Sequence, residues 1–339
     1  MKGWWWKLTG VLLLLYTVYM GLHTPLGPAL VHTSVGRIAP GEVSVIATGY
    51  NTHFQQDAPQ VWLENDGERV CALSVEPASD VEVALTFNVP EGFRNNLTSL
   101  WAWSATDGTV VLREAFFTEG QGTGTGLESC TVGDAPRAGF SFPNRSILNE
   151  TIRNLFFHVP MWFTMMVLMT VALWQSLKVL RNGSMEADRK ALSAVDTSLL
   201  FAALGLMTGS IWARATWGDW WTSDPKLNGA AVAVLVYAAY LILRGSVPDP
   251  HKRARLAAIY NIFAYVLMML FTMVLPRLTD SLHPGSGGNP AFNQYDLDSS
   301  LRAVFYPAVL GWILLGLWAY TLHERTARLK SLADETNDR

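Results

Sequence analysis

Residues 155–177 read LFFHVPMWFTMMVLMTVALWQSL, a stretch without a single Asp, Glu, Lys or Arg. An α-helix needs roughly 20 apolar residues to cross the hydrocarbon core of a bilayer, and this stretch is long enough. Further stretches with almost no charge are residues 8–22, 199–217, 227–243, 256–275 and 301–322. The sequence therefore predicts a membrane protein with six transmembrane helices, which the overall composition of 50% hydrophobic residues would not by itself decide.

The charged residues are distributed unevenly, although the net charge of the chain is only −3. Residues 24–150 contain no lysine, and their six arginines stand against fifteen acidic residues. Residues 178–190 and 244–255 and the start of the C-terminal tail are instead rich in Lys and Arg. Because basic loops stay in the cytoplasm, both termini should be inside, and residues 24–150, 217–226 and 276–300 should be outside.

The exported residues after the first apolar stretch carry short β-branched and aromatic runs separated by Gly, Pro, Asn and Asp, a pattern typical of β-strands. We therefore predict an all-α polytopic bundle of six transmembrane helices with an inserted extracytoplasmic β-sandwich-like domain. The expected parts are a first transmembrane helix at 1–23, the β-rich domain at 24–145, a five-helix membrane domain at 146–325 and a cytoplasmic tail at 326–339. The first helix is interpreted as an uncleaved signal anchor, with a cleaved signal peptide as the alternative.

The two cysteines of the chain, Cys71 and Cys130, both lie in the exported segment. That compartment permits a disulfide between them. Cys71 is equally compatible with a buried thiol on a strand.

The segment between the third and fourth predicted helices, residues 214–226, reads RATWGDWWTSDPK. An aromatic belt at the membrane surface explains one or two tryptophans, but not Trp217, Trp220 and Trp221 within five positions. Their indoles can form a flat apolar platform with cations at its edges. Such a surface suits a large planar ligand that bears carboxylates.

Two histidines are expected at the same outer surface. His158 begins the second helix, and His283 lies in the outer loop before the last helix. A single histidine at a helix end is ordinarily only a solvated or capping side chain. Two histidines near a Trp-rich loop instead indicate a shared binding site. Two neutral imidazoles on opposite faces of a porphyrin give six-coordinate iron.

These residues resemble a known family. The Trp-Gly-x-Trp-Trp-x-x-Asp-Pro-Lys segment, with His-Val-Pro before it and Leu-His-x-Gly-Ser after it, is similar to the haem-handling cytochrome c assembly proteins of the CcmC and CcsA type. The resemblance covers about residues 147–325. One Trp-rich loop with a His on either side, within six helices, looks closest to the CcmC branch.

The resemblance implies a site. His158 and His283 would be the axial ligands of iron, and the haem-facing loop would comprise Trp217, Trp220, Trp221 and Asp224. Arg153 and Lys226 match family positions where basic residues bind the haem propionates. Arg214 is a further cation that we add from its location alone, with a snorkelling side chain as the alternative. Ser223 departs from the aromatic that many relatives carry there, and residues 24–145 lie outside the resemblance.

The resemblance also implies a function without catalysis. The chain would bind haem b non-covalently and transiently at the outer face of the bacterial inner (cytoplasmic) membrane. It would present haem to a haem chaperone or to an apocytochrome c, with ABC-type membrane and ATPase subunits as further partners and no nucleic acid. The alternatives are a b-type electron-transfer cytochrome, which the absence of a second His pair within the helices disfavours, and a haem exporter or lyase subunit of a larger complex.

Overall fold

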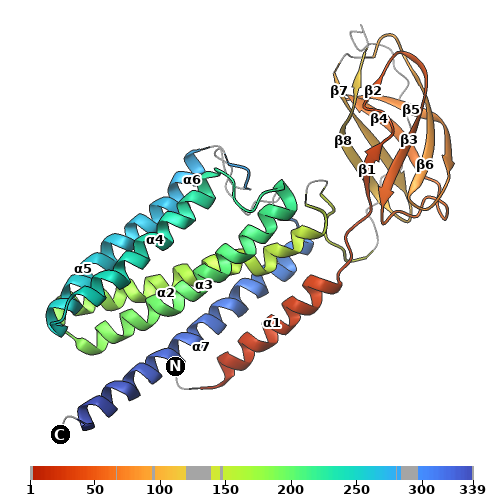
Figure 1. Cartoon of the computed structure of the whole chain (residues 1–339). Helices are drawn as coiled ribbons and strands as arrows, with labels where there is room; N and C mark the ends of the chain where they lie inside the picture. The colour runs from red at the N-terminus through yellow and green to blue at the C-terminus, as the bar shows by residue number, and fades with distance from the viewer. Residues whose placement is uncertain are drawn as a thin grey trace. The chain divides into compact units, whose positions relative to one another are not determined.

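The computed structural model divides the chain into two compact units, residues 24–150 and the remainder (Figure 1). It describes residues 3–65, 67–93, 96–119, 139–145, 148–279, 281–283 and 297–337. The expectation of an all-α protein is wrong, because residues 24–150 contain an eight-stranded sheet. The β-branched runs of the exported segment form a sheet with a core of its own, so the chain contains both helices and strands.

The membrane unit is helical, and six helices in the described part of the chain are long and apolar enough to span a bilayer. This number agrees with the count expected from the apolar stretches. Its elements are α1 (Trp5–His23), the 3-10 helix η1 (Asn149–Asn154), α2 (Leu155–Asn182), α3 (Met185–Trp217), α4 (Pro225–Ser246), α5 (Pro250–Met269), the π-helical turn η2 (Leu270–Val274), α6 (Leu275–Leu278) and α7 (Ser299–Asn337).

The helix ends follow from local sequence signals. Gly183 ends α2 in the left-handed conformation at φ 64°, which glycine adopts without steric cost. Ser184 then caps α3 by accepting a hydrogen bond from the Ala187 amide. Asp224 and Asp249 cap α4 and α5 in the same way, each followed by a proline at the first helical position.

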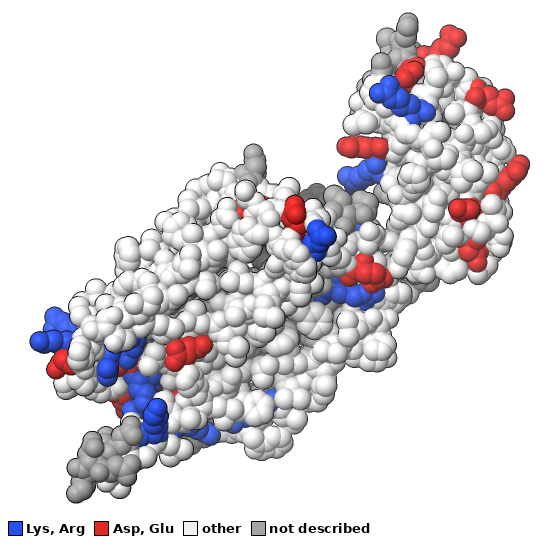
Figure 2. All heavy atoms as spheres, in the orientation of Figure 1, with Lys and Arg blue, Asp and Glu red and all other residues white. Residues whose placement is uncertain are grey.

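The turns between these helices gather positive charge at one end of the membrane unit. Figure 2 shows Lys and Arg side chains at the end where α2 turns into α3 and α4 turns into α5. At this end Arg244 of α4 donates two hydrogen bonds to Asp188 of α3, at 2.6 and 2.8 Å, and the pair is largely shielded from solvent. The two helices are therefore tied together at their basic end by a bidentate ion pair.

The second unit holds one mixed sheet in the order β1-β3-β6-β5-β4-β7-β8-β2. The strands are β1 (Ala29–Thr33), β2 (Arg37–Ile38), β3 (Gly41–Tyr50), β4 (Gln60–Asn65), β5 (Glu68–Pro77), β6 (Glu82–Val89), β7 (Leu97–Ser104) and β8 (Gly108–Thr118). All neighbours are antiparallel except β2 and β8.

Strand β5 joins the two halves of this sheet. Its residues 68–71 pair with β4, and its residues from Ala72 onward pair with β6, with a register shift between Ala72 and Ser74. The buried side chains of both halves, including Val45, Leu63, Phe87 and Leu100, form one core. Cys71 is disulfide bonded, and Cys130, the only other cysteine of the chain, lies outside the described residues.

Candidate functional site

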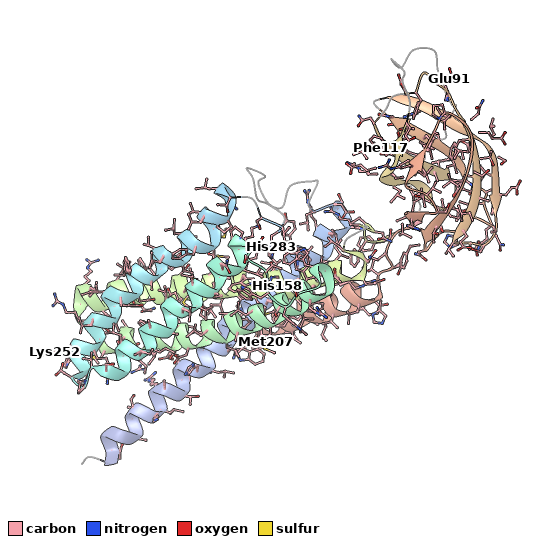
Figure 3. The ribbon with its side chains drawn as sticks, turned by 45° about the horizontal axis from the view of Figure 1, so that its top comes forward. Glu91, Phe117, His158, Met207, Lys252 and His283 are labelled. Carbon is pink, nitrogen blue, oxygen red and sulfur yellow. The ribbon has the colours of Figure 1, made fainter. Side chains whose placement is uncertain are left out.

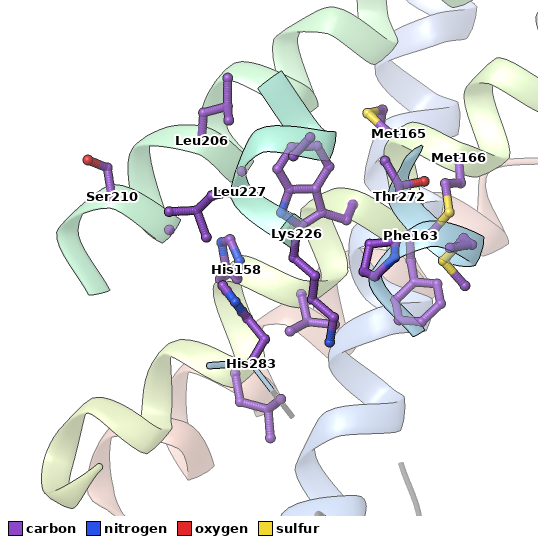
Figure 4. Close-up of a pocket in the computed structure, with 18 of the residues that line it drawn as sticks. His158, Phe163, Met165, Met166, Leu206, Ser210, Lys226, Leu227, Thr272 and His283 are labelled. Carbon is purple, nitrogen blue, oxygen red and sulfur yellow. The ribbon is translucent and has the colours of Figure 1, made fainter. Parts of the chain in front are cut away.

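A cavity of about 290 Å³ opens among α2, α3, α4 and the η2–α6 segment, at the end of the membrane unit opposite the basic turns (Figure 3). Its walls are mostly apolar, with Trp162, Phe163, Met165 and Leu206 among the residues that form them. Both His158 and His283 line it, and Figures 3 and 4 show the two imidazoles close together. The two histidines singled out from the sequence therefore share one pocket.

His158 lies in the first turn of α2, and its ring orientation is fixed from α3. Its Nδ1 lies 3.1 Å from Oγ1 of Thr208. The Thr208 hydroxyl has one proton, which it donates to the Leu204 carbonyl at 2.8 Å, so it must accept the bond from His158. This pattern assigns the proton of a neutral His158 to Nδ1 and leaves an unprotonated Nε2, the form in which a histidine binds a metal.

The ring of His283 is also held through its Nδ1, in this case by a carboxylate instead of a hydroxyl. Its Nδ1 donates to Oδ1 of Asp224 at 3.0 Å, which fixes the orientation of the ring. Burial lowers the pKa of His283 below its usual value, although the Asp224 carboxylate acts in the opposite direction. The imidazole is therefore neutral at physiological pH, as iron ligation requires.

Asp224 holds the His283 segment on the start of α4. Besides His283, its carboxylate accepts hydrogen bonds from the Ser281 hydroxyl at 2.7 Å and from the backbone amides of Leu282 and Lys226 at 2.8 and 2.9 Å. Burial by itself would raise the pKa of this carboxyl, but the hydrogen bonds from Ser281, Leu282 and Lys226 hold it below its usual value. Asp224 is buried and is not among the residues that line the cavity, so it lies behind His283 rather than on the haem-facing surface expected from the sequence.

The three tryptophans of the loop occupy different environments. Trp217 packs edge-on against the His283 ring, with centroids 4.9 Å apart, and Trp212 contacts the same ring at 5.6 Å. Trp221 lines the cavity, and its indole donates to Asn228. Trp220 is 59% exposed and is not part of the cavity wall. In this conformation the loop does not form one continuous platform of three indoles.

Of the three cations named from the sequence, Lys226 lines the cavity. Arg153 donates to the Gly21 carbonyl of α1 at 2.7 Å, and Arg214, in the last turn of α3, donates to the carbonyl of Gly218 directly after that helix. Neither arginine belongs to the cavity wall. Arg277 of α6 also lines the cavity, so the positive charges beside the cavity are Lys226 and Arg277.

The sequence reasoning missed Arg277, Thr208 and Gly209. A methyl group at Gly209 would lie 2.6 Å from Cε1 of His158, so the glycine is what lets the imidazole lie against α3. One turn earlier, Gly205 lets the ring of Trp162 lie against α3 in the same way. The spacing Gly205-x-x-x-Gly209 is a known sign of close helix contact in membranes and was a signal available in the sequence.

These features suit a large apolar ligand that carries a metal and anionic groups. Two imidazoles, each held at Nδ1, line the cavity, the other walls are mostly apolar, and two cations lie beside them. Haem combines these features, and its iron takes imidazole as an axial ligand.

The comparison with known proteins agrees with a protein that handles haem. Residues 131–337 match the profile of the CcmC family, described as heme exporter protein C. The chain belongs to this family, and the resemblance inferred from the Trp-rich loop and its flanking histidines is thereby confirmed.

Individual relatives are named heme exporter protein C or cytochrome c biogenesis protein CcsA. The chain is 26% identical to heme exporter protein C of Paracoccus denitrificans over 59% of its own length and 83% of the relative. It is 35% identical to heme exporter protein C of Bradyrhizobium diazoefficiens over 33% of this chain and 43% of the relative. It is 36% identical to the cytochrome c biogenesis protein CcsA of Prochlorococcus marinus over 25% of this chain and 27% of that protein. The matched part therefore spans less than half the length of the last two relatives.

Proposed function

We propose that this protein binds haem in the cavity between His158 and His283 and delivers it for cytochrome c maturation. The observation that carries the proposal is that His158 and His283 line one apolar cavity, each with its Nδ1 held by a side chain of the protein. Haem supplies an iron atom that accepts both imidazoles. The names of the relatives, heme exporter protein C and CcsA, support the same role.

In this proposal the residues of the chain bind and orient rather than catalyse. The two imidazoles hold a non-covalent haem b, Lys226 and Arg277 neutralise its propionates, and Trp221 with the apolar walls excludes water. Trp217 and Trp212 restrict the His283 ring from the sides. The protein has no turnover of its own and passes haem to a haem chaperone or an apocytochrome c, with ABC-type subunits as further partners.

The orientation in the membrane belongs to the same proposal. The basic turns and both termini are cytoplasmic, since basic loops remain inside. The cavity then faces the outside of the bacterial inner membrane, where cytochromes c are assembled.

An absorption spectrum of the full chain, purified in detergent from haem-replete cells, tests this proposal. We expect a six-coordinate bis-imidazole haem in the wild type and a shift away from it in His158→Ala and in His283→Ala, partly restored by added imidazole. His251→Ala is the matched control, because His251 is exposed at the start of α5, at the basic end. A haem-free wild-type protein, or spectra unchanged by both ligand variants, would contradict the proposal.

A further inference from the structure

A second cavity, of about 510 Å³, lies at the basic end of the membrane unit, at the opposite end of the helices from the histidines. The N-terminal segment and α1 contribute Trp4, Trp6 and Lys7 to its wall, α3 contributes Lys190, and α7 contributes Arg325. Nothing in the proposed haem function uses these residues. The cavity is therefore a separate feature of the fold.

The charges around this cavity are predominantly positive. Lys7 and Arg325 have no carboxylate within 4.0 Å among the residues that the structure describes, so their charges are uncompensated there. Lys190 pairs with Glu186 at 2.5 Å, and the one acidic residue of the wall, Glu324, is met by Arg189 at 3.5 Å. The four cations Lys7, Lys190, Arg325 and Arg189 thus face the two carboxylates Glu186 and Glu324, which leaves two positive charges in excess.

Aromatic rings position the first of these cations. The Nζ atom of Lys7 lies 5.2 Å from the ring centroid of Trp318 on α7 and 5.7 Å from that of Trp6. Cation–π contacts at these distances hold the ammonium group without neutralising it. Lys7 is therefore fixed between α1 and α7 with its charge available to an anion.

The cavity lies at the level of a membrane surface. The first candidate span begins at Trp5, and Trp4 and Trp5 expose 72% and 63% of their surface. Exposed tryptophans at the start of a span are typical of the interface, where lipid headgroups lie. At this depth the anion present at high concentration is the phosphate of a lipid, and basic pockets between transmembrane helices on the cytoplasmic side bind such headgroups.

We propose that the cavity formed by the start of α1, the start of α3 and α7 binds the phosphate headgroup of an anionic membrane lipid. Lys190 and Arg325 approach the phosphate from α3 and α7, and Lys7 approaches it from α1. One headgroup then bridges three helices that come from distant parts of the sequence. Its binding stabilises the membrane unit, because a ligand that binds only the folded state raises the unfolding temperature.

Thermal unfolding of the full chain in detergent tests this proposal, with phosphatidylglycerol, phosphatidylcholine or inorganic phosphate added at equal concentrations. We expect phosphatidylglycerol to raise the Tm of the wild type well above the other two additions. In Lys190→Gln/Arg325→Gln the affinity for phosphatidylglycerol should fall roughly fivefold for each cation removed. The charge-preserving variant Lys190→Arg/Arg325→Lys should keep most of the lipid effect.

The matched control is Lys252→Gln/Arg253→Gln, which removes two positive charges at the same basic end, from the first turn of α5 and away from the cavity wall. Its response to phosphatidylglycerol should equal that of the wild type. An equal lipid effect in Lys190→Gln/Arg325→Gln would overturn the proposal. So would inorganic phosphate acting as strongly as phosphatidylglycerol, which would indicate a site for a soluble anion. Loss of haem absorbance in the cavity variant with an unchanged lipid effect would assign the cavity to haem instead.

Discussion

Asp224 shows how one side chain can join segments that are far apart in the sequence. It caps α4, and it binds Ser281 and His283, which follow it by 57 and 59 residues. The Asp-Pro pair predicts the cap from local rules. The bond to His283 cannot be predicted in that way, because it depends on how α4 and the segment after α6 meet in space.

The isosteric change Asp224→Asn tests this role. An amide can still cap α4, but it lacks the charge that orients the Nδ1 proton of His283. Loss of such a partner behind a metal ligand typically lowers affinity about 10- to 100-fold, and we expect a decrease in haem affinity of this size. The measurement is a haem titration followed by absorbance.

Asp249→Asn is the control for this prediction, because Asp249 is also an N-cap followed by proline, at the start of α5. It should leave the titration unchanged. Equal affinities in Asp224→Asn and the wild type would reduce Asp224 to a helix cap.

The sequence predicts a role for some of the other residues of the site and not for the rest. His158 and His283 stand out because they are expected at the outer ends of apolar stretches. Thr208 lies inside such a stretch and resembles any small polar residue of a transmembrane helix, and only the distance to His158 reveals its role. Arg153 and Arg277 both lie at the end of the membrane unit that holds the cavity, and the sequence favours the first, whereas the packing of α6 brings the second to the cavity.

Among the helices, the pairing of α2 with α3 determines the position of His158. Gly205 and Gly209 let the rings of Trp162 and His158 lie directly on the α3 backbone. The site therefore depends on close helix contact as much as on the ligands themselves. Apolar periodicity predicts both helices but does not say which of their faces meet.

We expect Gly209→Ala to displace His158 and to weaken the bis-imidazole spectrum, because the added methyl would lie 2.6 Å from the ring. Gly316→Ala is the control for packing damage. Its methyl would lie 2.3 Å from Cγ2 of Thr164, a clash between α7 and α2 that involves no ligand. Both variants should lose about 1–3 kcal/mol of stability by overpacking. If the spectrum of Gly209→Ala changes no more than that of Gly316→Ala, the glycine has no specific role in ligation.

The π-helical turn η2 was also outside what sequence reasoning expected. Apolar residues run through 256–275 without interruption, and a continuous α-helix was the simplest interpretation. Instead the helix widens at Leu270–Val274, where Thr272 and Met273 line the cavity, and Pro276 follows in α6. Such turns occur frequently at functional sites, and hydropathy cannot distinguish them from ordinary helix.

At the scale of the whole molecule, the sequence predicts the number of spans well because each apolar stretch is separated from the next by charged or Pro-rich residues. It also indicates strands in residues 24–150. It does not predict their order, since β5 changes partners from β4 to β6 along its length. That order depends on contacts between strands that are distant along the chain.

The two units have separate cores, and this leads to a prediction for the whole molecule. Leu63 is fully buried in the core of the sheet, and among the residues that the structure describes this core lies within 30–116. Leu63→Ala should cost about 2–5 kcal/mol of stability in the β unit and increase its proteolysis from outside. The haem spectrum should stay at the wild-type level. A parallel loss of the spectrum would show that the membrane unit needs the folded β unit.

The long separation between His158 and His283 has a consequence for biosynthesis. Translation proceeds from the N-terminus, so α2 and α3, which carry His158 and Thr208, are made first. The nascent chain must still insert α4 and α5 before Ser281 and His283 can bind the carboxylate of Asp224. A chain stalled after α4 would therefore contain His158 without His283. The site is completed only when the fifth span has entered the membrane, which makes its assembly a late event in insertion.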